Sequence, residues 1–348
     1  MSEIHPKNST FLFGHDDAEL QLHGDAKAGR LPHGLIISGI RGIGKATLAY
    51  RLARILLTQE GVNPEAVFSR IAAGSHTDLL VLEPEFDEKK GEYAKDINVD
   101  QAREVAKFLS LTAAESNWRV VIIDSADALN TNAANAILKI LEEPPPQAIL
   151  LLISHQPSLL LPTIRSRCQV IKLRPLKHEA FVEAAKYLLP DAGGGKLSAF
   201  AQLTGGAPGK ALEYEEQGAL AMYDEILALV ESLPVLDSAA LHAFADKALV
   251  EKPHEKWRLF ADLALFLFER IAKQAADIGL EGVTSREVEV LEHLAKLYPP
   301  HVWANKWQQS ADNFLLAQRL HLDYKQVIIT FFHSISSEEG LRLGSAAA

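Results

Sequence analysis

The stretch Gly34-Leu35-Ile36-Ile37-Ser38-Gly39-Ile40-Arg41-Gly42-Ile43-Gly44-Lys45 decides the fold. Its first five residues form a short apolar run typical of a buried strand, and an amphipathic helical pattern follows it. The spacing Gly-x-x-x-x-Gly-Lys between them is that of a P-loop, whose glycines let backbone N–H groups turn toward a phosphate. Candidate nucleotide-binding residues are therefore Gly39, Gly42, Gly44 and Lys45.

Two positions lack the side chains that ATP hydrolysis needs. Ala46 stands where a P-loop ATPase has Ser or Thr to hold Mg²⁺, and Thr47 lies about 100° further around the helix. A second apolar strand, residues 120–123, ends in Asp124, as in sites where this carboxylate approaches the metal. In AAA+ ATPases a Glu follows that Asp, whereas here Ser125 follows, and its hydroxyl is a poor base at neutral pH.

The pattern therefore predicts a degenerate nucleotide site to which Ala46, Thr47 and Asp124 also contribute. Such a site does not hydrolyse ATP and requires no cofactor. Lys45 and the glycines are still present, so weak binding of ATP or ADP remains an open alternative.

The first 175 residues alternate short apolar runs with helical patterns, which is typical of a parallel α/β sheet. Further strands are expected at 78–82, 149–153 and 169–173, and helices at 98–110 and 133–141. After Pro175 the strand pattern ends and helical periodicity dominates. We predict an α/β domain at 1–175, a small helical domain at 176–215 and a larger helical domain at 216–348.

Composition excludes several classes of protein. The 35 basic and 45 acidic residues give a net charge of −10, which argues against a chain that coats nucleic acid by bulk electrostatics. Only residues 101–180, with 9 basic and 7 acidic side chains, are net positive. The single cysteine, Cys168, excludes an internal disulfide framework. Neither a signal peptide nor a membrane helix is apparent, and we expect a cytoplasmic protein without membrane contact.

Short motifs outside the P-loop carry a specific resemblance. They are Leu138-Lys139-Ile140-Leu141-Glu142-Glu143-Pro144-Pro145, Ser166-Arg167-Cys168, Phe13-Gly14-His15, Leu31-Pro32-His33-Gly34, Ile97-Asn98-Val99-Asp100-Gln101-Ala102-Arg103-Glu104 and Gly206-Ala207-Pro208-Gly209-Lys210-Ala211-Leu212. Over about residues 4–215 the chain resembles the clamp-loader subunits of the AAA+ family. The resemblance implies an AAA+ α/β domain, a small helical lid and an all-α collar domain.

The resemblance also implies roles for individual residues. Arg167 matches an arginine finger that reaches across a subunit interface to the γ-phosphate held by a neighbour; the alternative is an ion-paired surface arginine. Lys210 stands at the sensor-2 position in place of the usual Arg, which keeps the charge and loses the forked geometry. Ser154 or His155 stands where sensor 1 belongs, and the sequence does not choose between them.

The partners implied by the resemblance are the gamma/tau and delta subunits of a bacterial clamp loader, with the sliding clamp and primer–template DNA reached through the complex. Arg103 and Lys107 share one face of the expected helix at 98–110, which in the family lies near DNA; a solvated face is an equal alternative. No zinc or other metal site is expected, because the four-cysteine module common in the family is missing.

The resemblance, taken with the departures at Ala46 and Ser125, implies a non-hydrolysing clamp-loader subunit of DNA polymerase III that helps load the sliding clamp on primed DNA. An active gamma/tau-like AAA+ motor is the alternative, against which Ala46 and Ser125 argue. A small-molecule P-loop kinase needs an intact Mg²⁺ ligand and leaves the Ser-Arg-Cys motif unexplained.

Overall fold

The computed structural model describes residues 5–87, 92–94, 96–250 and 252–336. The chain divides into two compact units, one made of residues 1–191 and 205–210 and the other of residues 192–204 and 211–348. The three-part division into 1–175, 176–215 and 216–348 stays a prediction.

The first unit is built on a five-stranded parallel sheet with the strand order β2-β5-β6-β1-β7. The strands are β1 (Gly34–Ser38), β2 (Leu79–Leu82), β5 (Arg119–Asp124), β6 (Ala148–Ser154) and β7 (Gln169–Lys172). In the register of the sheet, Gly34 of β1 lies opposite Leu150 of β6, and Leu35 of β1 lies opposite Gln169 of the edge strand β7. All five strands were expected, and the predicted α/β class is confirmed.

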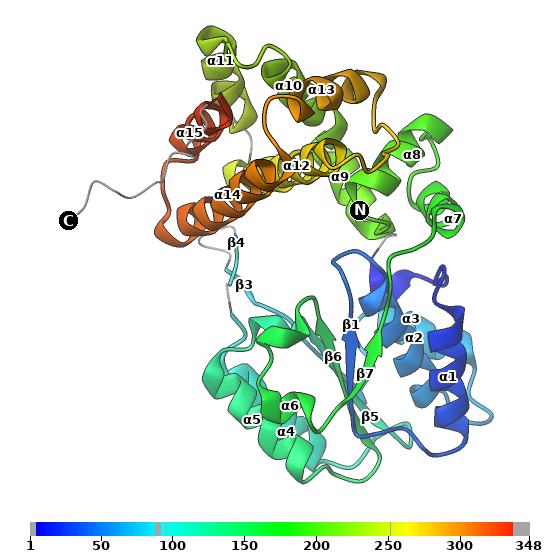
Figure 1. Ribbon diagram of the computed structural model, residues 1–348. Coiled ribbons are helices and arrows are strands. Elements are labelled where there is room, and N and C mark those ends of the chain that lie inside the picture. Colours follow the sequence, from blue (N-terminus) through cyan, green and yellow to red (C-terminus); the bar gives the residue numbers. More distant parts are fainter. Residues whose placement is uncertain (1–4, 88–91, 95, 251, 337–348) are drawn as a thin grey trace. The chain divides into compact units, whose positions relative to one another are not determined.

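Helices cover both faces of this sheet (Figure 1). On one face, side chains of α4 (Val99–Ser110) and α5 (Thr131–Glu142) pack into a core with alternate residues of β5 and β6. On the other face lie α1 (Asp16–Lys27), α2 (Lys45–Leu57) and α3 (Pro64–Ala72). Because both faces are covered, β1 and β6 are buried along their whole lengths, which explains their continuous apolar sequences.

Smaller elements complete this unit. They are the 3₁₀ helices η1 (Pro6–Asn8), η2 (Ala126–Ala128) and η3 (Pro157–Leu159), the helices α6 (Pro162–Arg165) and α7 (His178–Leu188), and an antiparallel pair of β3 (Phe86–Asp87) and β4 (Glu92–Tyr93). The charged, glycine-containing sequence at 86–93 favours a loop, and the β3–β4 pair lies there instead, because strands of two residues have no periodicity that a sequence can show.

The second unit is helical among the residues described. Its helices include α8 (Gly194–Leu203), α10 (Ala219–Val230), α11 (Ser238–Ala248), α12 (Pro253–Ala275), α13 (Ser285–Ala295), α14 (Pro300–Leu320) and α15 (Tyr324–Ser336). Large aromatic side chains, among them Trp257, Phe260, Phe268 and Trp303, are fully buried in its core. In the described part of the chain, none of the helices is both long enough and apolar enough to span a bilayer.

Candidate nucleotide site and arginine finger

The P-loop residues lie where the sequence predicts, between the end of β1 and the first turn of α2. Lys45 is the first residue of α2 and is only 3% exposed. Its Nζ donates hydrogen bonds to the carbonyl oxygens of Gly39 at 2.9 Å and Ile40 at 2.8 Å. Burial lowers the pKa of Lys45 to about 8, although the carboxylates of Asp124 and Asp127 oppose the shift.

Asp124 ends β5 close enough to Lys45 for the two charges to interact. Burial raises the pKa of Asp124, and the ammonium group of Lys45 opposes that effect. The predicted pair of a P-loop lysine and a strand-end carboxylate is therefore brought together at the carboxyl edge of the sheet.

Asp127, in η2, lies two residues after Ser125. Both of its carboxylate oxygens accept hydrogen bonds, from the Ser154 hydroxyl at 2.6 Å and from the His155 amide at 2.5 Å. Ser154 is fully buried. The two sensor-1 candidates, Ser154 and His155, therefore donate hydrogen bonds to the same carboxylate, that of Asp127. These bonds link the end of β6 to the segment after β5.

The segment that precedes α1 packs against the same loop. His15 is buried, its Nε2 lies 2.9 Å from the carbonyl oxygen of Ile43, and burial lowers the pKa of its imidazole. A Cβ on Gly44 would lie 3.1 Å from Cδ1 of Leu12. The motif at residues 13–15 therefore borders the P-loop directly.

The P-loop also contacts the segment at residues 205–210, which belongs to the same compact unit. The amide of Gly209 donates a hydrogen bond to the carbonyl oxygen of Gly42 at 2.8 Å. Gly42 has φ +77°, and a Cβ at this position would overlap the backbone nitrogen of Lys210. The backbone of Lys210, at the start of α9 (Pro208–Gln217), therefore lies beside the P-loop.

This arrangement has one cationic side chain suited to a phosphate, Lys45, and it lacks two of the side chains that hydrolysis uses. The side chain at position 46 is a methyl group, so no hydroxyl is offered for Mg²⁺ at the start of α2. Asp124 is followed by Ser125, and the carboxylate of Asp127 is occupied by two donors. The assignment of these residues to a nucleotide stays a prediction.

Arg167 lies just after α6, and its side chain is 37% exposed. Its Nη2 lies 3.0 Å from Oε1 of Glu142, the last residue of α5. Its Nη1 donates to the carbonyl oxygen of Thr163 at 3.1 Å. The motif that contains Glu142 and the Ser-Arg-Cys motif are therefore joined by an ion pair, as the alternative for Arg167 expects, with a partner that the sequence does not identify.

Arg167 and the P-loop lie at opposite edges of one sheet. Gly34 begins β1, and a Cβ there would lie 2.8 Å from Sγ of Cys168 and 3.7 Å from the carbonyl oxygen of Arg167. Gly39 follows the other end of β1. With a rise of about 3.3 Å per residue, Gly34 and Gly39 are roughly 16 Å apart along the strand. Arg167 is thus remote from the P-loop of its own chain.

The other predicted site residues, Arg103 and Lys107, lie on the exposed surface of α4. Nη1 of Arg103 donates to Oδ1 of Asp100 at 2.7 Å, and both side chains are largely exposed. Such pairs contribute little to stability. The expected proximity of this face to DNA stays a prediction.

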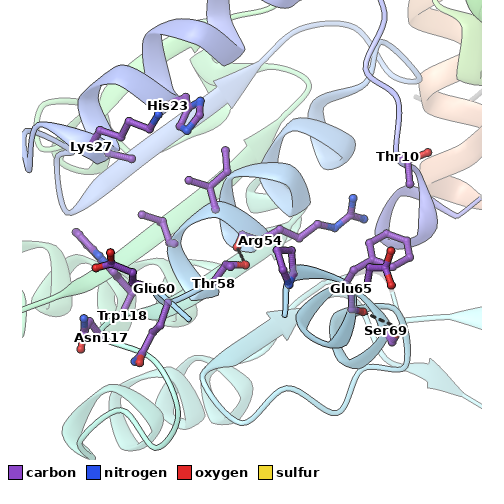
Figure 2. A pocket seen from close by; sticks show the side chains of 16 residues that line it. Thr10, His23, Lys27, Arg54, Thr58, Glu60, Glu65, Ser69, Asn117 and Trp118 are labelled. Carbon is purple, nitrogen blue, oxygen red and sulfur yellow. Dashed lines mark hydrogen bonds between the residues drawn. The ribbon is translucent and has the colours of Figure 1, made fainter. Parts of the chain in front are cut away.

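A cavity of about 1070 Å³ opens beside the C-terminal end of α2 (Figure 2). Its wall includes His23 and Lys27 from α1, Phe68 from α3, and Trp118 from the segment before β5. Ile55, in its lining, lies ten residues along α2 from Lys45, or about 15 Å. The cavity is therefore separate from the P-loop.

Sequence reasoning missed three participants in these arrangements. From its place just after Ser125, Asp127 is expected on a turn that points elsewhere, and the C-terminal position of Glu142 on its helix favours a partner cation and solvation equally. The Gly42–Gly209 hydrogen bond joins residues far apart in the chain, and no local pattern encodes it. An acidic residue at a helix C-terminus was the one available signal, because the helix dipole disfavours it without a partner cation.

Residues 14–177 match a protein family described as DNA polymerase III, delta subunit. The chain is 43% identical over 192 residues to the DNA polymerase III subunit delta' of Pseudomonas aeruginosa, a match that covers 53% of this chain and 56% of that protein. The subunit delta' of Escherichia coli K12 is 35% identical over 194 residues, which is 53% of this chain and 55% of the relative. The chain resembles the delta-prime subunit of the bacterial DNA polymerase III clamp loader.

These matches span about half the length of the delta-prime relatives. The gamma/tau subunit of Mycobacterium bovis is 29% identical over 317 residues, covering 83% of this chain and 54% of that protein. Among solved structures, a gamma subunit-related protein of Thermotoga maritima is similar with a TM-score of 0.46 and 20% identity, over 91% of this chain and 100% of that one.

Proposed function

We propose that this chain is a non-hydrolysing, delta-prime-like clamp-loader subunit that completes the ATP site of a neighbouring subunit with Arg167. One observation carries the proposal: the exposed arginine lies at the edge of the sheet opposite its own P-loop. From that position the guanidinium can reach a phosphate that another chain binds, but it cannot reach a phosphate at its own P-loop. Its planar, permanently charged fork suits a phosphate.

The state of the chain's own P-loop supports the same proposal. Ala46 and Ser125 remove the Mg²⁺ ligand and the water-activating carboxylate, while Arg167 keeps the group that acts in trans. Under this proposal the partners are gamma/tau and delta subunits, with the sliding clamp and primer–template DNA reached through the assembled complex. Any ATP or ADP at Lys45 is then bound without turnover.

The experiment compares ATP hydrolysis by the purified chain with hydrolysis by the complex reconstituted with its gamma/tau and delta partners on primed DNA. The chain alone is expected to show no turnover. In the complex, Arg167→Ala is expected to lower turnover at the adjoining site by about 10³-fold or more, the usual contribution of an arginine finger. Unchanged DNA-stimulated hydrolysis would remove this role from Arg167.

Arg165→Ala is the matched control for this experiment. Arg165 is an exposed arginine two residues earlier, and in the described part of the chain it has no carboxylate within ion-pair distance. It should leave turnover in the complex unchanged.

A gamma/tau-like motor is the second candidate, favoured by the alignment with a gamma/tau subunit over 83% of this chain. It requires ATP turnover by the chain without partners. Hydrolysis at several per second by the purified wild-type chain would establish the motor and exclude the non-hydrolysing subunit.

A further inference from the structure

We propose that Glu142 is a positioning residue that orients the guanidinium of Arg167 toward the neighbouring subunit's nucleotide. This inference rests on the proposed function, since it needs Arg167 to act in trans. The two residues belong to separate sequence motifs and meet at 3.0 Å, between Oε1 of Glu142 and Nη2 of Arg167.

Packing brings the two residues together. Leu141 and Cys168, their chain neighbours, both pack against Gly34 at the start of β1, where a Cβ would lie 2.7 Å from Cδ2 of Leu141 and 2.8 Å from Sγ of Cys168. Burial raises the pKa of the Cys168 thiol to about 11, so this sulfur serves as a small packed side chain. The absence of a side chain at Gly34 thus allows the ends of two motifs to converge.

Two contacts hold the guanidinium from different sides. The carbonyl oxygen of Thr163 accepts a hydrogen bond from Nη1 of Arg167 at 3.1 Å, and Glu142 lies beside Nη2. The one-turn helix that carries Thr163 is anchored by the fully buried side chain of Ile164. An arginine held at both terminal nitrogens loses less rotamer freedom when it meets a phosphate.

The position of Glu142 is otherwise unfavourable. It ends α5, where the negative end of the helix dipole disfavours a carboxylate, and residues 144–146 are prolines that stop the helix there. Because both partners are more than one-third exposed, their ion pair adds little to folding stability. A carboxylate of this kind is better explained by its effect on Arg167 than by its effect on the fold.

The test measures kcat and KM for ATP in the reconstituted complex with Glu142→Gln, Arg167→Ala and the double variant. Glu143→Gln is the matched control: it makes the same change one residue later, and Glu143 makes no ion pair among the described residues. Glu142→Gln is expected to lower kcat three- to tenfold with KM unchanged, and to have no further effect when Arg167 is already Ala. Glu143→Gln is expected to have the kcat and KM of the wild type. Glu142→Gln and Glu143→Gln should both unfold at the wild-type temperature.

The outcomes separate the two proposals. If Arg167→Ala abolishes turnover at the site but Glu142→Gln matches the wild type, the positioning role is overturned and the finger stands. An equal loss from Glu142→Gln with and without Arg167 would also overturn it, because the effect would not pass through the guanidinium. If Arg167→Ala itself has no effect, the proposed function fails and this inference fails with it.

Discussion

The carbonyl oxygen of Gly42 accepts a hydrogen bond from the amide of Gly209 at 2.8 Å, and this bond fixes the P-loop against the segment at residues 205–210. The approach is so close that only a glycine fits at position 42. Residues separated by more than 160 positions therefore depend on each other for their conformation.

Gly42→Ala should destabilise the first unit by about 2–4 kcal/mol, because φ is +77° and the new Cβ would overlap a backbone nitrogen. Urea unfolding followed by circular dichroism measures the loss. Gly205→Ala is the control, since Gly205 has φ +59° with open space around it and should cost only about 1 kcal/mol. Equal losses in the two variants would contradict the close contact.

The pKa of Lys45, lowered by burial to about 8 from 10.5, predicts a pH-dependent stability. Between these two pH values the unfolded state binds more protons than the folded state, so the free energy of unfolding rises with pH. The whole window is worth roughly 3 kcal/mol. Lys45→Met should remove this rise in urea titrations between pH 8 and 9.5, whereas Lys107→Met, on the exposed face of α4, should retain it. If the free energy of unfolding of Lys45→Met rose with pH as steeply as that of the wild type, the lowered pKa of Lys45 would be refuted.

Asp78→Asn should destabilise the first unit by about 2–4 kcal/mol. Asp78 is fully buried, and its carboxylate accepts hydrogen bonds from the amides of Ala114, Glu115 and Ser116 at 2.7–2.8 Å and from the Ser116 hydroxyl at 3.0 Å. An asparagine keeps one acceptor oxygen and leaves amides unsatisfied. Asp100→Asn, at an exposed ion pair, is the control and should cost under about 1 kcal/mol.

The same carboxylate predicts acid sensitivity. Burial alone would raise the pKa of Asp78, but its four hydrogen bonds outweigh that effect and hold the pKa below its ordinary value. The stabilisation is therefore complete above about pH 4 and is lost as the pH falls below that value. Acid titration of the wild type and of Asp78→Asn measures it, and equal acid dependence of the two would contradict the prediction.

In the helical unit, Glu287→Gln should cost about 3–5 kcal/mol, because it breaks a buried ion pair. Glu287 is fully buried, and its carboxylate accepts hydrogen bonds from Arg270 at 2.6 and 2.9 Å and from the Tyr223 hydroxyl at 2.6 Å. The exposed pair of Glu231 and Arg286 offers the control, since Glu231→Gln should cost less than about 1 kcal/mol. Urea unfolding followed by tryptophan fluorescence compares them, and similar costs would refute the prediction.

The sheet was largely predictable because each strand is encoded by a short continuous apolar run. The first expected strand, Gly34–Ser38, has the bounds found in the structure. The sequence offers Asn98 or Asp100 as the N-cap of the helix at 98–110, and the structure has Asn98, whose side chain forms a capping box with Gln101. Such features depend on neighbouring residues only, so a single sequence contains them.

The rest of the candidate site depends on contacts between distant segments. Lys45 and Asp124 were paired in advance because a known motif relates them, whereas no motif relates Glu142 to Arg167 or Asp127 to Ser154. Ala46 and Ser125 were recognised as departures without any structure, since the missing chemistry is local. Sequence therefore indicated which groups are absent, and the fold was needed to show which groups meet.

The opposite placement of Arg167 and the P-loop on one sheet gives the chain a polarity. In a two-fold symmetric pair, any contact between Arg167 and the partner's P-loop occurs twice, once in each direction. Under the proposed function, a contact that Arg167 gives in one direction only needs a head-to-tail arrangement, which produces a closed ring or an open spiral. In such a series the activating contact runs in one direction only, and a member with a degenerate P-loop can give that contact without making use of one itself.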